Sequence, residues 1–163
     1  PALFFIIMLM FIGGSPGSTA GGIKTTTVFI IFYTMIQKLR GRKNVNLFFR
    51  RISEETILKA FFIFTLSVII TFLGLLLLLV LEDKSVIKIM FEVFSAYGTV
   101  GLSMGSDMGA NYSLSGDFSS IGKLIIILIM FTGRVGIMTA ANAFISKSRK
   151  ESVSYPETRI MVG

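Results

Sequence analysis

The segment 98–103, with the sequence GTVGLS, could bind a bare cation through its own backbone. Consecutive carbonyl oxygens that point the same way can replace the water shell of an ion. Glycine permits the unusual backbone angles that such a row requires, because it has no Cβ atom. We expect a helix over 85–97, and the C-terminal end of a helix attracts positive charge. We therefore predict a cation filter made by four backbone carbonyls, those of Thr99, Val100, Gly101 and Leu102.

A second stretch, residues 13–27 with the sequence GGSPGSTAGGIKTTT, lies between apolar runs at 2–12 and 28–36. Neither run is long enough to cross a bilayer alone, which takes about 20 residues. We expect one crossing made of two half-helices with irregular backbone between them. Such backbone at membrane depth must be buried in protein or line a watery cavity, and broken helices mark ion pathways. The alternative is an exposed loop between two helices at the membrane surface.

The composition excludes most enzyme chemistry. The 163 residues include no Cys and no His, which excludes thiol catalysis, disulfide scaffolds, zinc sites and the commonest general base. Hydrophobic residues make up 53% of the chain, and the mean hydropathy is +0.79. These apolar residues are gathered in runs, as in membrane proteins. We therefore predict an all-α integral membrane protein that is not an enzyme.

The charges predict an orientation and account for the net charge of +7 without nucleic acid. Basic residues crowd positions 38–51 and recur from Lys147, whereas the loop 104–120 contains Asp107 and Asp117 and no basic residue. Basic loops usually lie in the cytoplasm. The loop 38–55 and the C-terminus are therefore expected inside the cell. The predicted segments are a broken helix over 1–40, a basic loop 41–55, a span 56–81, an external loop 104–120, a span 121–146 and a tail 147–163.

The helix predicted at 85–97 is too short to be a full span, and it lies between two ends that both face outside. A re-entrant pore helix fits this position, with the filter 98–103 as its returning chain. The alternative is an amphipathic helix on the outer surface. Glu92 lies within this helix and is the one candidate for a proton relay in the apolar segments, although it could equally be structural.

An internal repeat supports the pore interpretation. The sequence MFIGG at 10–14 matches MFTGR at 130–134, so the first helix corresponds to the last one. A rival alignment places Gly14 and Gly17 on Gly98 and Gly101, but it matches little beyond the glycines. On the first alignment, both helices follow a pore loop.

The motifs FIGGSPGSTAGGIKTTT, AYGTVGLSMG and MFTGRVG together resemble the membrane subunit of the Trk/Ktr/HKT potassium-uptake superfamily, closest to its KtrB branch. That resemblance implies four helix–pore-loop–helix repeats around one central pore. This chain would then hold the second helix of repeat three and all of repeat four, and the upstream repeats would be missing. The transported ion would be K⁺, bound by the filter carbonyls.

The same resemblance implies a gate below the filter. Residues of the stretch 13–27 would form an intramembrane gating loop, and Arg134 in the last helix would face the pore beside it. For Lys24 two interpretations stay open: it contacts carbonyls or a carboxylate in the shut gate, or it extends toward the cytoplasm. The implied gating residues are Gly13, Gly14, Gly17, Ser18, Thr19, Gly21, Gly22, Lys24 and Arg134.

The resemblance also implies partners in a bacterial cell membrane. These are a second copy of the chain in a homodimer, a cytoplasmic nucleotide-binding ring of the KtrA/TrkA kind, and membrane lipid. No cofactor is expected in this chain, with Na⁺ an open candidate for a modulator. Two other classes stay open: an ion-coupled secondary carrier, which would need more intramembrane carboxylates, and a non-transporting assembly subunit, which would need neither filter nor glycine-rich break.

Overall fold

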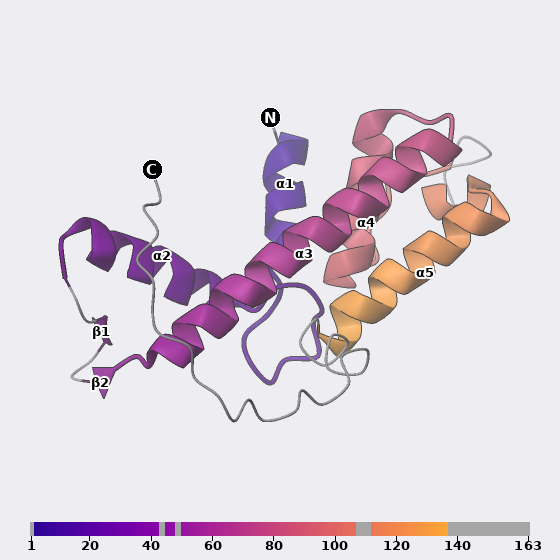
Figure 1. Cartoon of the computed structure of the whole chain (residues 1–163). Helices are drawn as coiled ribbons and strands as arrows, with labels where there is room; N and C mark the ends of the chain where they lie inside the picture. The colour runs from indigo at the N-terminus through magenta and orange to yellow at the C-terminus, as the bar shows by residue number, and fades with distance from the viewer. Residues whose placement is uncertain (1, 43–44, 48–49, 107–111, 137–163) are drawn as a thin grey trace, which may run out of the picture.

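The structure is a computed structural model of the chain and describes residues 2–42, 45–47, 50–106 and 112–136. These residues are mainly helical, as Figure 1 shows, which agrees with the predicted all-α class apart from one short hairpin. Residues 137–146 of the predicted span 121–146 and the whole predicted tail 147–163 lie outside the described residues.

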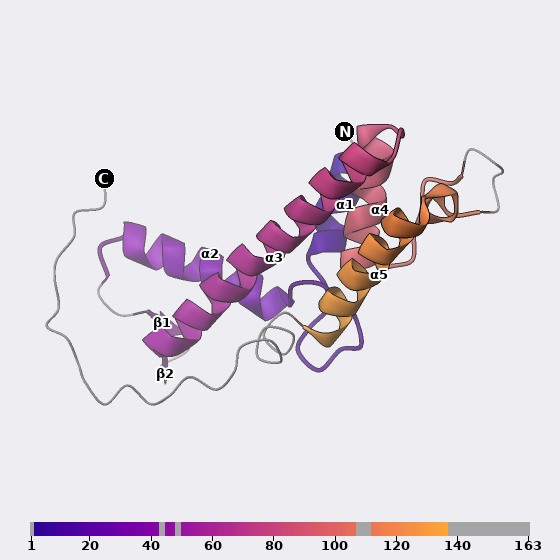
Figure 2. The ribbon, with the colours of Figure 1, turned by 45° about the vertical axis from the view of Figure 1, so that its right-hand side comes forward.

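The first predicted helix is interrupted. Helix α1 spans Ala2–Phe11 and helix α2 spans Thr25–Leu39. Glycine and proline are the residues least compatible with a helix interior, and both occur in the irregular segment 12–24. Figures 1 and 2 show that α2 does not continue the direction of α1 but runs away from it, beside the N-terminal half of α3.

Helix α3, Glu54–Leu81, is the longest element, with 28 residues. Its first turn is capped by Ser53, whose side chain accepts a hydrogen bond from the Thr56 N–H at 3.3 Å. Glu54 and Glu55 place negative charge at the positive end of the helix dipole. Among the described residues, α3 is the one helix that is long and apolar enough to cross a membrane.

A small hairpin interrupts the predicted basic loop 41–55. Strand β1, Asn46–Leu47, pairs antiparallel with β2, Arg50–Arg51. The Tyr33 hydroxyl donates to the carbonyl of Asn46 at 2.6 Å and so ties the hairpin to α2. A strand of two residues is too short to show an alternation of apolar and polar residues, so the sequence pattern does not predict this hairpin.

Helix α4, Val86–Gly98, lies at the centre of the remaining helices. It packs against α1, against α3 and against α5, which spans Ser120–Val135. The short 3₁₀ turn η1, Leu114–Asp117, covers the junction of α4 and α5. The main apolar core is shared by α3, α4, α5 and η1, and its most deeply buried side chains include Leu78, Ile89, Val93 and Leu114.

The C-terminal ends of α1, α4 and α5 converge on the segment 12–24 (Figure 2). Since each helix carries partial negative charge at its C-terminal end, three such ends in one place favour positive charge there. Arg134 lies in the last turn of α5, at this convergence.

Candidate functional site

The predicted filter begins with a sharp reversal of the chain. Helix α4 ends at Gly98, and Thr99 has a φ of 52° in the left-handed region. A β-branched residue avoids this region, at a cost of about 1–3 kcal/mol, so the surrounding structure must hold it there. The Thr99 N–H donates to the Ala96 carbonyl at 3.1 Å and the Val100 N–H to the Ser95 carbonyl at 2.9 Å.

After the reversal the chain doubles back along α4. The Ser95 hydroxyl donates to the carbonyl of Leu102 at 2.5 Å, which brings Leu102 to the level of Ser95. One of the four predicted filter carbonyls is thus turned toward α4. Val100 is 45% exposed, and a Cβ atom on Gly101 would meet nothing within 4 Å. The segment therefore has one side held against α4 and one side open among the described residues.

The glycine-rich segment forms a closed loop. Ile12 and Ile23 pair as a parallel bridge, in which the Gly13 N–H donates to the Ile23 carbonyl at 2.8 Å and the Ile23 N–H to the Phe11 carbonyl at 3.2 Å. The ammonium group of Lys24 donates to the Ala20 carbonyl at 2.6 Å. Lys24 therefore contacts backbone carbonyls of its own loop, which also include that of Ser18 at 3.3 Å.

This loop contacts both the predicted filter and α5. The Gly21 N–H donates to the side-chain oxygen of Thr99 at 2.9 Å. The Gly22 N–H donates to the Gly133 carbonyl at 3.3 Å, and the Arg134 guanidinium donates to the Thr19 carbonyl. The structure therefore brings together the predicted filter at Thr99, the predicted gating loop at Thr19, Gly21 and Gly22, and Arg134.

The other predicted gate residues lie away from the filter. A Cβ atom on Gly17 would meet nothing within 4 Å, and Gly14 lies against the Ser18 side chain within the loop. The Ser18 hydroxyl accepts from the Ala20 N–H at 3.1 Å, which shapes the loop itself. Gly13 lies at the neck of the loop, where a Cβ atom would sit 1.9 Å from the Gly21 carbonyl oxygen.

Two further glycines let helix backbones touch at the convergence. A Cβ atom on Gly98 would lie 2.3 Å from the Met10 carbonyl oxygen, and one on Gly133 would lie 2.0 Å from that of Tyr97. Real Cβ contacts do not reach such distances, so these helix crossings require glycine. The sequence did not predict Gly133 as a site residue, because its crossing partner Tyr97 is far away in the chain.

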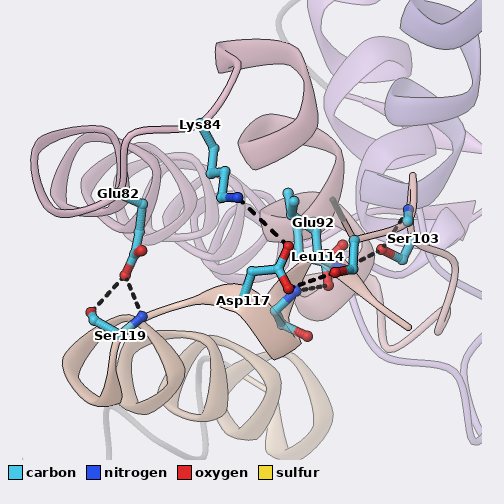
Figure 3. Close-up of polar contacts among 10 residues, drawn as sticks. Glu82, Lys84, Glu92, Ser103, Leu114, Asp117 and Ser119 are labelled. Atoms are coloured by element: carbon cyan, nitrogen blue, oxygen red, sulfur yellow. Dashed lines mark hydrogen bonds and ion pairs between the residues drawn. The ribbon is translucent and has the colours of Figure 1, made fainter. Parts of the chain in front are cut away.

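A set of polar contacts on the far side of the filter was missed from the sequence (Figure 3). The Ser103 hydroxyl oxygen accepts from the Leu114 N–H at 2.9 Å, and a Glu92 carboxylate oxygen accepts from the Ser115 N–H at 3.1 Å. Nearby, the Glu82 carboxylate accepts from the Ser119 N–H at 2.9 Å. The one available signal was the spacing of Glu92 and Ser95, three apart on one face of an apolar helix.

A cavity of about 290 Å³ lies between the end of the predicted filter, α4 and α5. Oxygen-bearing side chains on its wall include those of Glu92, Ser95, Ser103 and Ser115. With Thr99 and Ser113 on the same wall, these side chains could contact an ion or solvent behind the predicted filter. Among the described residues, no group of three or more His, Cys, Asp or Glu side chains that could hold a metal ion is found.

Comparison with known proteins assigns the sequence to a family. A family model described as TrkH, cation transport protein, matches residues 2–154. The Ktr system potassium uptake proteins B and D of Bacillus subtilis (strain 168) are 40% and 37% identical over 161 residues, covering 99% of this chain and 34% of each relative. The potassium/sodium uptake protein NtpJ of Enterococcus hirae is 39% identical over 167 residues, covering 99% of this chain and 35% of that protein.

The chain thus spans about a third of the length of these relatives, and it matches them along almost its whole length. A family model that covers residues 2–154 includes every element of the fold. The chain therefore belongs to the TrkH family of cation transport proteins, which are membrane transporters and not enzymes.

Proposed function

We propose that this chain forms one filter segment and the gate of a pore for passive, gated K⁺ uptake. Its relatives are named as potassium uptake proteins, and one is named for both potassium and sodium. The observation that carries the proposal is the meeting of the glycine-rich loop with Thr99 on one side and Arg134 on the other. A loop that touches both a candidate filter and a charge at the end of α5 is suited to control an ion path.

In this proposal K⁺ is bound by the carbonyls of Thr99, Val100 and Gly101. Leu102 is the last residue of the segment. Its carbonyl oxygen has two lone pairs, and because the Ser95 hydroxyl uses one, the other remains available to an ion. A site of carbonyls alone replaces the water of a weakly hydrated cation without binding it too tightly to leave. Three further segments, supplied by repeats outside this chain, would complete the ring.

The proposed gate acts by blocking and by charge. The loop 13–24 lies at the end of the filter where Thr99 begins, so ions leaving the filter must pass it. The Arg134 guanidinium holds the loop through the Thr19 carbonyl and adds a positive charge. A unit charge about 4 Å from an ion raises its energy by about 4 kcal/mol at an effective dielectric constant of 20. Glycine-rich backbone with few packed side chains can be displaced at low cost.

The wider assembly is proposed from the same relationship. The chain would supply the second helix of repeat three (1–40, with the gate at about 13–27) and the whole of repeat four (56–146). It would lie in a bacterial cell membrane, surrounded by lipid, with the loop 38–55 and the C-terminus in the cytoplasm. A second copy and a KtrA/TrkA-like nucleotide-binding ring would be its partners, since two relatives are named as members of a Ktr system.

The test is K⁺ uptake at low external K⁺ in a bacterium that lacks its own uptake systems. The complete reading frame that contains this chain would be expressed as wild type and as Arg134→Ala, with the regulator supplied and the membrane amount measured. We expect wild type to restore uptake and Arg134→Ala to change its rate by about tenfold or more, because the charge and the loop contact are both lost.

Other outcomes would point elsewhere. Restored uptake that is indifferent to Arg134→Ala would keep the pore and remove Arg134 from the gate. Absence of uptake from a well-expressed wild type would contradict the proposal and favour a non-transporting assembly subunit. Uptake that requires a proton or sodium gradient would favour an ion-coupled carrier.

A further inference from the structure

We propose that Glu92 is a positioning residue for the outer end of the ion filter. It would act through the 3₁₀ turn η1, and it would set how well the pore distinguishes K⁺ from Na⁺. This inference rests on the proposed function of the segment 99–102. It assigns a role to three residues outside the proposed ion-binding segment 99–102: Glu92, Ser95 and Ser103.

The burial of Glu92 is the first reason. The residue lies in the middle of α4 and is only 6% exposed. One carboxylate oxygen accepts the Ser115 N–H at 3.1 Å, and the other has no hydrogen-bond partner among the described residues. A buried carboxyl group with an unsatisfied oxygen is costly compared with an apolar side chain of similar size. A glutamate at this position therefore lowers the stability of the fold. Its hydrogen bond to the turn η1 is the contribution that an apolar side chain could not make.

The second reason is that η1 passes this restraint to the filter. Leu114, next to Ser115, is fully buried, and its N–H donates to the Ser103 hydroxyl oxygen at 2.9 Å. The same oxygen accepts the Gly105 N–H at 3.2 Å. Ser103 directly follows the ion-binding segment 99–102, so η1 restrains its position. Glu92 in turn restrains η1, together with the buried Leu114 side chain and the ion pair between Lys84 and Asp117 at 3.6 Å. Figure 3 shows these contacts in sequence from α4 through η1 to Ser103.

Ser95 provides a parallel link. It lies one helical turn after Glu92 on the same face of α4, and its hydroxyl donates to the Leu102 carbonyl at 2.5 Å. We call the closed set Glu92, Ser95, Leu102, Ser103, Leu114 and Ser115 the outer clasp. The filter is thus held at both ends, by the end of α4 at Thr99 and by the outer clasp at Leu102 and Ser103. Binding sites that discriminate between similar ligands depend on such support for the groups that touch the ligand.

The experiment compares Glu92→Ala with Glu92→Gln in the complete reading frame. The readout is the ratio of the apparent KM for Na⁺ to that for K⁺, measured from uptake with the membrane amount recorded. The glutamine amide oxygen can still accept the Ser115 N–H, whereas alanine cannot. We expect Glu92→Ala to lower the ratio about fivefold, equivalent to about 1 kcal/mol, and Glu92→Gln to restore most of it.

Glu82→Ala is the matched control. Glu82 also accepts a backbone N–H near η1, that of Ser119 at 2.9 Å, together with the Ser119 hydroxyl at 2.6 Å. This contact holds the start of α5 and does not reach Ser103. The control should therefore leave the ratio unchanged. Ser103→Ala should lower the ratio as Glu92→Ala does, and the double variant should be no worse than the worse single variant, because both act through one link.

The outcomes separate this inference from the proposed function. A wild type without K⁺ uptake would contradict the pore, whereas a selective wild type with an unchanged ratio in Glu92→Ala would overturn the outer clasp alone. A lower membrane amount at an unchanged ratio would likewise overturn it, since a purely structural role predicts that result. Glu92→Gln as impaired as Glu92→Ala, or additive effects of Glu92→Ala and Ser103→Ala, would also overturn it.

Discussion

A methyl group at Gly133 is expected to push helices α4 and α5 apart. The Cβ atom of Gly133→Ala would sit 2.0 Å from the Tyr97 carbonyl oxygen and 2.9 Å from its carbonyl carbon. Both are backbone atoms inside α4, so no side-chain rotation can relieve the collision. Ordinary contact begins at 3.4 Å, and the helices must therefore separate by about 1.4 Å.

That separation has consequences for stability and for the gate. Overpacking of this kind typically costs about 1–3 kcal/mol. The Gly22 N–H bond to the Gly133 carbonyl is already 3.3 Å long and should break, while Thr99 moves with the end of α4 away from Gly21. We expect a lower thermal midpoint of the purified protein and an altered K⁺ uptake rate per molecule.

Gly116→Ala is the control for this prediction. A Cβ atom on Gly116 would meet nothing within 4 Å, and this glycine does not have a positive φ. Its substitution should change stability by less than about 0.5 kcal/mol. If Gly133→Ala had the same thermal midpoint and uptake as Gly116→Ala, the close contact between α4 and α5 would be refuted.

Two further predictions concern single hydrogen bonds. Thr99→Val keeps the side-chain shape but removes the acceptor of the Gly21 N–H, which should destabilise the loop contact by about 1–3 kcal/mol. Uptake without the regulator should therefore rise several-fold as the loop loosens. Thr99→Ser should stay near wild type, and equal basal uptake in the wild type and both variants would contradict a link between the loop and the predicted filter. Tyr97→Phe should lower the free energy of unfolding by about 1 kcal/mol, because the buried Tyr97 hydroxyl donates to Ser67 at 2.7 Å. Tyr112 is 68% exposed, so Tyr112→Phe should leave the thermal midpoint unchanged. An equal loss of stability in both variants would argue against the Ser67 contact.

Much of the helical structure could be predicted from local sequence. The apolar run that follows the basic loop predicted a helix over 56–81, and α3 covers Glu54–Leu81. The predicted helix 85–97 lies within one residue of α4, Val86–Gly98. The break after Phe11 follows from glycine and proline, which act on their immediate neighbours. Whether these helices have the predicted membrane roles stays a prediction.

The contacts of the outer clasp could not be predicted from local sequence. Glu92 stood out in the sequence as a carboxylate in an apolar helix, but neither of its two roles, structural or proton relay, could be chosen from the sequence. Its partner Ser115 is 23 residues away and lies in η1, which packs into the core through Leu114. The same holds for the hairpin β1–β2, which is positioned by a tyrosine on α2.

The contact between the proposed filter and the proposed gate was likewise decided by packing. The Gly21 to Thr99 bond joins residues 78 apart in the chain, and the Arg134 to Thr19 contact joins residues 115 apart. Local composition specifies that a segment is helical, broken or glycine-rich, since those preferences depend on a few neighbouring residues. Which backbone groups then pair depends on how closely three helix ends can approach. That approach is set by glycines whose contacts lie on other helices, such as Gly98 against Met10 and Gly133 against Tyr97, and so it exists only in the folded chain.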